Sequence, residues 1–123
     1  MYLVGAEHPN KATARILLER CIHEGTRLVT DAEVLQEVLH RYIAISRRDA
    51  IQPAFEALLG VVDDVFAIEL PEVERAKTLL HGRPGLSARD AIHLATMERH
   101  GVMRILSFDA GFDGHPGIER IRA

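Results

Sequence analysis

The sequence has 123 residues, of which 47% are hydrophobic, and a formal net charge of −3. This length fits one domain with its own hydrophobic core, and no apolar run is long enough to span a membrane. The net charge argues against a protein that binds nucleic acid through overall positive charge, and the single cysteine, Cys21, excludes an internal disulfide bond. We therefore expect one domain covering residues 1–123, without a membrane segment, in the cytoplasm.

Helical and extended segments alternate in the first part of the chain. Residues 11–23 are predicted to be helical, and residues 27–30 to form a short strand. The pattern Thr30-Asp31-Ala32-Glu33 is typical of a capping box and predicts a helix that runs to about Ile45. The apolar residues of this helix that are expected to face the core are Val34, Leu35, Val38, Leu39, Tyr42 and Ile43.

The charged residues of this helix and of the turn after it have a simple explanation. Glu37 shares a helical stripe with Arg41, and periodicity favours a solvated ion pair between them at i,i+4. Arg41, Arg47 and Arg48 are weak candidates for contacts with phosphate, since a solvated turn also explains the basic pair.

The same alternation continues in the second part of the chain. Helices are predicted over residues 49–59 and, with Pro71 in the first turn, over residues 71–80. Strands are predicted over residues 65–70 and 102–107, with a short edge strand over residues 118–121. Alternating strands and helices predict an α/β fold with a parallel sheet and helices on both faces.

The segment from Ser87 to Gly101 has the clearest helix signals. Ser87 is a favourable N-cap and Gly101 a favourable residue for the helix end. One stripe of this helix is polar and is expected to face solvent; it consists of Arg89, His93, Thr96 and His100.

Asp90 lies on another stripe of the same helix, together with Leu94 and Met97. A carboxylate on an apolar stripe is costly to bury unless a helix terminus, an arginine or a metal ion compensates its charge. Asp109 follows the strand at residues 102–107, and ligands of parallel α/β sheets bind beyond the carboxyl ends of strands. Two such carboxylates in one crevice indicate Mg²⁺ or Mn²⁺, although capping of the helix also explains Asp90.

These two segments carry a family resemblance. Ser87-Ala88-Arg89-Asp90-Ala91-Ile92-His93-Leu94-Ala95 and Ile105-Leu106-Ser107-Phe108-Asp109-Ala110-Gly111-Phe112 together resemble the C-terminal half of a PIN domain, in particular that of the VapC-type toxin ribonucleases. The resemblance implies a three-layer α/β/α fold and an endoribonuclease that uses Mg²⁺ or Mn²⁺ to cut RNA. It also implies a cognate antitoxin protein as partner and a homodimer.

The resemblance also implies roles for individual residues. Glu37, Asp90 and Asp109 would be the catalytic residues and metal ligands, and Asp113 a further ligand. Arg89 and Ser107 would lie beside these ligands and support them. For His93, a buried or surface histidine is a commoner role than a general base.

The chain departs from the family at its first residues. PIN domains start with a central strand that ends in Asp-Thr-Asn or Asp-Thr-Ser, and its aspartate is a principal metal ligand. Residues 1–5 instead resemble what normally follows that strand. We therefore expect the sheet to lack its first, central strand and metal binding to be weakened.

The sequence is also compatible with two other functions. One is a catalytically inactive module that binds the antitoxin, through Ile16, Leu17, Leu35 and Leu39. The other is an α/β domain whose aspartates only cap helices and pair with arginines.

Overall fold

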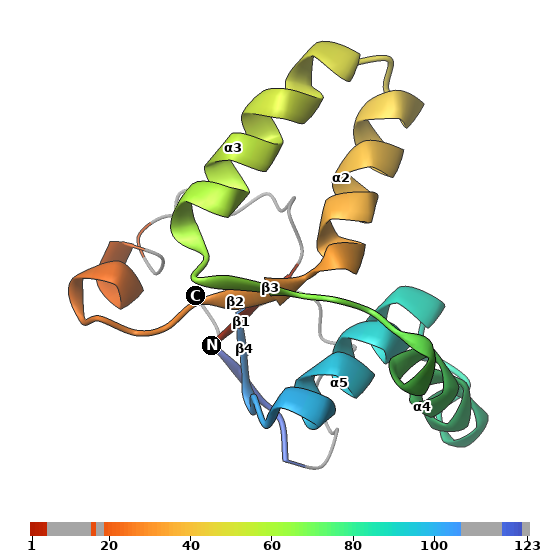
Figure 1. The fold of residues 1–123 in the computed structure, drawn as a ribbon. Helices are drawn as coiled ribbons and strands as arrows, with labels where there is room; N and C mark the ends of the chain where they lie inside the picture. Colours follow the sequence, from red (N-terminus) through yellow and green to blue (C-terminus); the bar gives the residue numbers. More distant parts are fainter. Residues whose placement is uncertain (5–15, 17–18, 107–116, 122–123) are drawn as a thin grey trace.

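The computed structural model describes residues 1–4, 16, 19–106 and 117–121, and Figure 1 shows their arrangement. The strands are β1 (Tyr2–Leu3), β2 (Val29–Asp31), β3 (Asp64–Phe66), β4 (Arg104–Leu106) and β5 (Glu119–Ile121). The helices are α2 (Ala32–Ala44), the short 3₁₀ helix η1 (Arg48–Ala50), α3 (Ile51–Val61), α4 (Leu70–Gly82) and α5 (Ala88–His100), and residues 19–23 are also helical.

The five strands form one parallel sheet in the order β3-β2-β1-β4-β5. The predicted strands near residues 27–30, 65–70, 102–107 and 118–121 are therefore confirmed, with shorter bounds that for β2 and β3 are shifted by one residue at one end. The expectation of a missing central strand is wrong, because β1 occupies the centre, where Tyr2 pairs with Val29 on one side and Ile105 on the other. Residues 1–4 are too few to show a period in the sequence, so only the pairing of their backbone identifies them as a strand.

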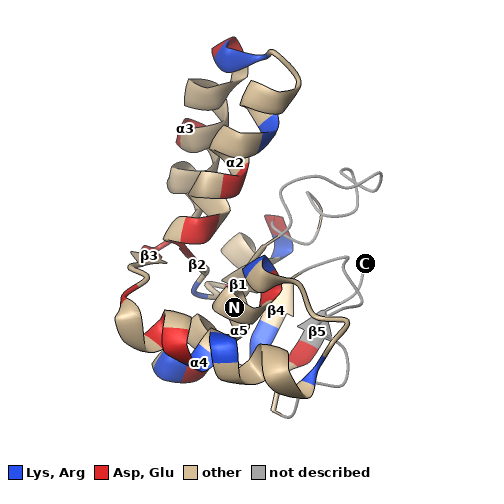
Figure 2. Cartoon of the chain, turned by 90° about the vertical axis from the view of Figure 1, so that its right-hand side faces the viewer, with Lys and Arg blue, Asp and Glu red and all other residues tan. Residues whose placement is uncertain are grey.

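Helices lie on both sides of this sheet. Helices α4 and α5 pack together on one side, whereas α2 and α3 project from the other as an antiparallel pair (Figures 1 and 2). The predicted α/β class with a layered parallel sheet is thus confirmed. No helix among the described residues is long and apolar enough to cross a membrane.

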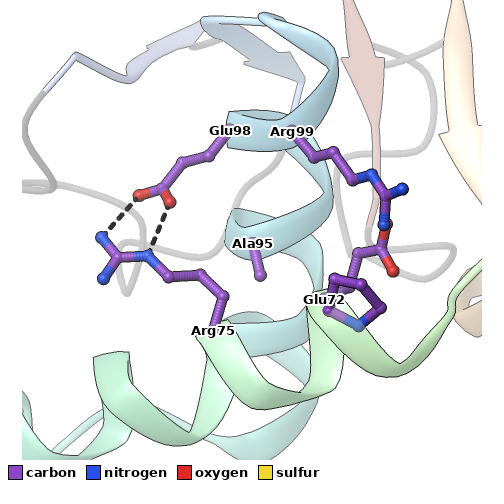
Figure 3. Close-up of a pocket in the computed structure, with 6 residues that line it drawn as sticks. Glu72, Arg75, Ala95, Glu98 and Arg99 are labelled. Carbon is purple, nitrogen blue, oxygen red and sulfur yellow. Dashed lines mark hydrogen bonds and ion pairs between the residues drawn. The ribbon is translucent and has the colours of Figure 1, made fainter.

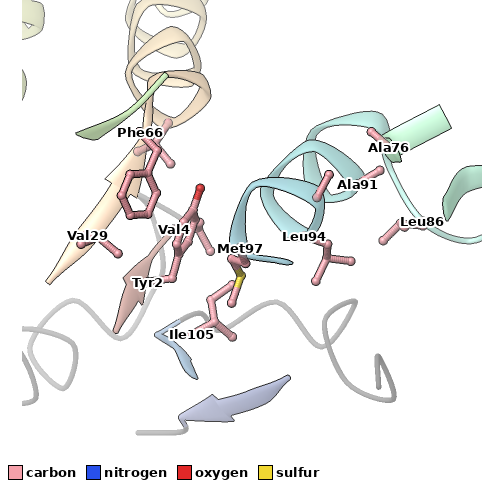
Figure 4. Packing of buried hydrophobic residues seen from close by; sticks show 12 residues of the cluster. Tyr2, Val4, Val29, Phe66, Ala76, Leu86, Ala91, Leu94, Met97 and Ile105 are labelled. Atoms are coloured by element: carbon pink, nitrogen blue, oxygen red, sulfur yellow. The ribbon is translucent and has the colours of Figure 1, made fainter. Parts of the chain in front are cut away.

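The hydrophobic core lies between the sheet and the α4–α5 layer. Figure 4 shows Tyr2 and Ile105 of the sheet facing Leu94 and Met97 of α5. Helix α5 contributes six buried residues, and two of them, His93 and Thr96, are polar. The expectation that His93 and Thr96 face solvent is therefore wrong: α5 packs on both the sheet and α4, so its buried surface extends beyond the apolar stripe.

The helix ends follow the sequence signals with one shift. Ser87 caps α5 by accepting a hydrogen bond from the Asp90 backbone N–H at 3.1 Å, and Gly101 ends it with a φ of 67°. Helix α2 is capped by Asp31 rather than by Thr30, because the Asp31 carboxylate accepts from the Val34 backbone N–H, whereas the Thr30 hydroxyl donates to the Leu3 carbonyl at 2.7 Å.

The outer turns of α2 are more exposed than its periodicity predicts. Val34 and Val38 are buried, but 39% of Leu39 and 46% of Ile43 are exposed. The physical reason is that α2 extends past the sheet, so that its distal turns pack mainly on α3 (Figure 1).

Candidate active site

A buried carboxylate, Asp31, marks the place where β2 ends and α2 begins. Its side chain is fully buried and accepts hydrogen bonds from three groups. Oδ1 accepts from the Val34 backbone N–H at 3.1 Å, and Oδ2 accepts from the Tyr2 hydroxyl and from His93 Nδ1, the latter at 2.7 Å. Each bond offsets part of the free energy that burying a carboxylate requires.

His93 connects this buried carboxylate to one near the surface. Its Nε2 lies 3.1 Å from Glu37 Oε1, and its side chain is only 2% exposed, against 17% for Glu37. Because carboxylates only accept hydrogen bonds, both ring nitrogens must donate, which requires the imidazolium form. Burial acts to lower the pKa of His93, but the hydrogen bonds and charges of Asp31 and Glu37 outweigh it and raise that pKa to about 9. We call these three residues the Asp31–His93–Glu37 array.

Negative charge accumulates around the outer end of this array. Burial, and then the nearby charge of Glu37, raise the pKa of Glu33 on the first turn of α2. Burial and the charge of Asp31 likewise raise the pKa of the Tyr2 phenol, which therefore stays protonated and donates to Asp31. Arg89 places its Nε 4.0 Å from Glu37 Oε1 and is 62% exposed, so it offsets little of this charge. Glu33 and Glu37 are thus neighbouring carboxylates on α2, and a cation between them would reduce their repulsion.

Asp90 lies in the first turn of α5, three residues before His93, and is partly buried. The positive end of the helix dipole stabilises its carboxylate there. Glu37 follows the carboxyl end of β2, and β4 ends at Leu106 in the same parallel sheet, so both strands end at one edge of it. The predicted residues after β4, namely Ser107, Asp109 and Asp113, lie outside the described part of the chain.

The predicted phosphate contacts lie farther along the α2–α3 hairpin. Arg41 is in the last turn of α2, while Arg47 and Arg48 lie at the connection to α3. Figure 2 shows that this connection is at the end of the hairpin away from the sheet. Arg47 forms two 3.1 Å hydrogen bonds with Asp49. Its charge is thus partly neutralised, which weakens the case for a phosphate contact.

Two residues of the array were not predicted as site residues. Asp31 was read as part of a helix cap, a role that it does have, and His93 as an ordinary histidine. The available signal was that Glu37 lies six residues after Asp31, in the helix that Asp31 precedes, and that a histidine follows Asp90 by three. Nothing in the sequence places these two helices against each other.

A separate hollow of about 380 Å³ lies between α4 and α5, lined by Pro71, Glu72, Arg75, Ala95, Glu98 and Arg99. Figure 3 shows that its charged groups face one another across the helices. Arg75 binds Glu98 through Nε at 2.9 Å, and Arg99 binds the buried Glu72 at 2.6 Å. These ion pairs link α4 to α5. Because the charges are already paired, the hollow is not a candidate for the active site.

Comparison with known proteins identifies the class. The family model of the PIN domain matches residues 1–117. The VapC ribonuclease Mb1869c of Mycobacterium bovis and ribonuclease VapC13 of Mycobacterium tuberculosis are each 59% identical over 121 residues, which cover 98% of this chain and 92% of the relative. Ribonuclease VapC23 of M. tuberculosis is 41% identical over 109 residues, covering 89% of this chain and 86% of that protein.

The fold agrees with a solved structure. The crystal structure of M. tuberculosis VapC20, described as a sarcin–ricin loop cleaving toxin, superposes with a TM-score of 0.70 at 21% identity and covers 89% of each chain. At that identity the likeness shows a shared fold. The chain belongs to the PIN-domain family, and within it to the VapC-type proteins.

Proposed function

We propose that this protein is a cytoplasmic VapC-type toxin that cleaves RNA as a Mg²⁺- or Mn²⁺-dependent endoribonuclease. The observation that carries the proposal is the partly exposed Glu37 carboxylate, which the array holds close to the strand ends of the sheet. Supporting it is the 59% identity to proteins named VapC ribonucleases over almost the whole chain.

The donor chemistry fits a hard divalent cation, because Glu37 and Asp90 offer carboxylate oxygens and the pKa of Glu33 is raised beside Glu37. In the described ranges, with 5–15 and 107–116 left aside, no three His, Cys, Asp or Glu side chains are grouped closely enough to hold a metal. The proposed ligand set is the one that the family resemblance implies: Glu37, Asp90 and Asp109, with Asp113 at its periphery.

Each residue has a distinct part in the proposed reaction. The bound cation would supply charge stabilisation at the scissile phosphate and assist the attacking water. Glu37 would hold the cation from α2 and Asp90 from the start of α5, where the helix N-terminus also favours anionic groups. Arg89, exposed beside Glu37, is placed to contact an RNA phosphate, and Ser107 would support Asp109.

The decisive experiment replaces Asp90 by Asn in the full chain and follows cleavage of a fluorescent RNA with Mg²⁺ or Mn²⁺ and with EDTA. We expect cleavage to fall by at least about 100-fold, since an amide cannot replace a charged ligand of a hard cation. The matched control is Glu74→Gln, an exposed carboxylate on α4, which should leave cleavage unchanged. Metal-dependent cleavage by the Asp90→Asn protein at the wild-type rate would contradict the assignment.

Binding of a cognate antitoxin is the second part of the proposal, and by itself it is the alternative function of a catalytically inactive module. The exposed apolar residues of the α2–α3 hairpin favour it: 46% of Ile43, 52% of Ile45 and 50% of Leu59 are accessible. Leu39 of the predicted partner surface is also exposed, and Ile16 is 59% exposed, whereas Leu17 lies outside the described residues.

Co-expression with a candidate VapB-type antitoxin would test this second part. An Ile43→Asp protein should lose copurification of the antitoxin, while Asp90→Asn should keep it. Copurification of the antitoxin without any RNA cleavage by the wild-type chain would favour the inactive module. Size-exclusion chromatography of the same samples would test the expected homodimer.

A further inference from the structure

We propose that His93 is a positioning residue for the reaction: its ring, held by Asp31, fixes the Glu37 carboxylate in the orientation that binds the cation. This inference rests on the proposed function. It goes beyond that function by assigning a role to His93 and Asp31, which are outside the proposed ligand set. The juxtaposition that carries it is the pair of hydrogen bonds from one buried ring to two carboxylates, Asp31 at the N-cap of α2 and Glu37 in its second turn.

The ring is itself immobile. Its side chain is 2% exposed, its Nδ1 is bound to Asp31 at 2.7 Å, and Asp31 is held in turn by Tyr2 and the Val34 backbone N–H. The ring also lies edge-on to Tyr2, with the two ring centroids 6.3 Å apart. A group fixed from several sides can fix the next group, which is how supporting residues orient metal ligands.

The Glu37 carboxylate can be stabilised by water without the hydrogen bond from His93. Its side chain is 17% exposed, so water can reach the carboxylate, whereas Asp31 is fully buried and depends on its protein partners. The bond from Nε2 therefore acts mainly on the orientation of Glu37. Fixing a free glutamate side chain requires roughly 1.5–2 kcal/mol of conformational entropy, and the array supplies that order before a ligand arrives.

The contacts also leave part of the carboxylate available. Within the described part of the chain, the contacts of Glu37 with His93 and Arg89 both involve Oε1. The other oxygen, Oε2, is thus the atom that we assign to the cation. A glutamate with one oxygen held by the protein and the other presented to the metal is a preorganised ligand.

Two substitutions separate this role from a purely structural one, because each keeps a different half of the array. In His93→Asn the amide nitrogen replaces Nδ1 and can still donate to Asp31, but the shorter side chain does not reach Glu37. In His93→Gln the longer side chain places its amide near Nε2 and can reach Glu37, but Asp31 loses a donor. Positioning predicts opposite orders in two measurements: His93→Asn should have the higher Tm, and His93→Gln the tighter Mn²⁺ binding and the faster cleavage.

The measurements are thermal unfolding of the metal-free protein, calorimetric titration with Mn²⁺, and kcat and KM for RNA. His93→Asn is expected to lose about 10–100-fold in Mn²⁺ affinity and in kcat with little change in KM. Adding His93→Asn to Glu37→Gln should produce little further loss, because His93 acts through Glu37. His100→Asn is the matched control, since it is the same substitution at the exposed end of α5. The His100 ring stacks on the Phe66 ring, with the two ring centroids 3.7 Å apart.

The outcomes separate this inference from the proposed function. Mn²⁺ affinity and kcat that follow the order of Tm among the His93 variants would overturn the positioning role, even if the wild-type protein cleaves RNA. If the wild-type protein binds Mn²⁺ but does not cleave RNA, the proposed function fails, and the affinities of the two variants still decide the inference. If it neither binds Mn²⁺ nor cleaves RNA, both are overturned.

Discussion

Two helical layers of this protein contrast in how they use apolar sequence. Helix α5 buries six of its 13 residues, whereas α3 buries none of its 11, although α3 has the more apolar composition. The difference arises because α5 lies between α4 and the sheet, while α3 packs mainly on α2 in a hairpin that projects from the sheet (Figures 1 and 2). Burial here depends on where a helix lies, and only secondarily on how apolar it is.

The contrast extends to the charged residues. Between α4 and α5, Arg75 binds Glu98 and Arg99 binds the buried Glu72. On the outer part of the α2–α3 hairpin, Arg47 binds its near neighbour Asp49, a pair that holds no two helices together. Ion pairs therefore join the helices of the α4–α5 layer, whereas the hairpin leaves apolar residues exposed where the proposed antitoxin contact would lie.

The largest effect expected is on the core of the α4–α5 layer. Leu94 is fully buried, so Leu94→Ala should lower the free energy of unfolding by about 2–5 kcal/mol. The same change at Leu59 of α3, which is 50% exposed, should lower it by less than about 1 kcal/mol. Urea unfolding followed by circular dichroism measures both, and equal losses would show that the hairpin is packed as tightly as the core.

A pH-dependent term should come from the array between the two layers. The pKa of His93 is raised to about 9, above its ordinary value of 6.5, so the folded state holds this proton more tightly than the unfolded state. The resulting stabilisation is complete below pH 6.5 and is lost as the pH rises through 9; it amounts to at most about 3 kcal/mol.

Unfolding of the wild-type protein between pH 6 and pH 10 tests this expectation. His93→Asn should remove most of the dependence, and His100→Asn should retain it. A wild-type curve that stays flat over this range would show that His93 is not bound as an imidazolium.

A smaller loss is expected at the start of α4. Glu72 completes the capping box with Glu69, and its other oxygen accepts from Arg99. Burial disfavours its charge, but these bonds outweigh burial and lower the pKa of Glu72. Glu72→Ala should reduce the free energy of unfolding by about 1 kcal/mol at pH 7, against almost no change for the exposed Glu74→Ala; a similar result for both would exclude the cap as a source of stability.

The smallest effect expected is a gain at the sheet end of α2. Burial and the charge of Glu37 raise the pKa of Glu33 in the folded protein. At a pH where Glu33 is ionised, its charge therefore destabilises the folded state relative to the unfolded state. Glu33→Gln should therefore raise stability at pH 7, by no more than about 0.5 kcal/mol. Thermal unfolding with and without Mn²⁺ checks this, because a cation beside Glu37 would reduce the repulsion and so the gain.

Much of the fold could be predicted from local patterns. The Ser87 cap, the Gly101 stop and Pro71 in the first turn of α4 all lie where the sequence indicated. Such signals depend on the backbone of a few neighbouring residues, which the local sequence controls. The central strand was missed for the opposite reason, since Tyr2–Leu3 is a strand only because β2 and β4 pair with it.

The residues of the candidate site also differ in whether local sequence or tertiary structure identifies them. The sequence alone determined the α/β class, both ends of α5 and, through the resemblance of two segments, the acidic residues Glu37, Asp90 and Asp109 as candidates. Only the tertiary structure decided that His93 turns inward and lies between Asp31 and Glu37, which are 62 and 56 residues away along the chain. Helical periodicity reports which residues share a face, but the packing of α5 against the sheet and α2 determines which of those faces is buried.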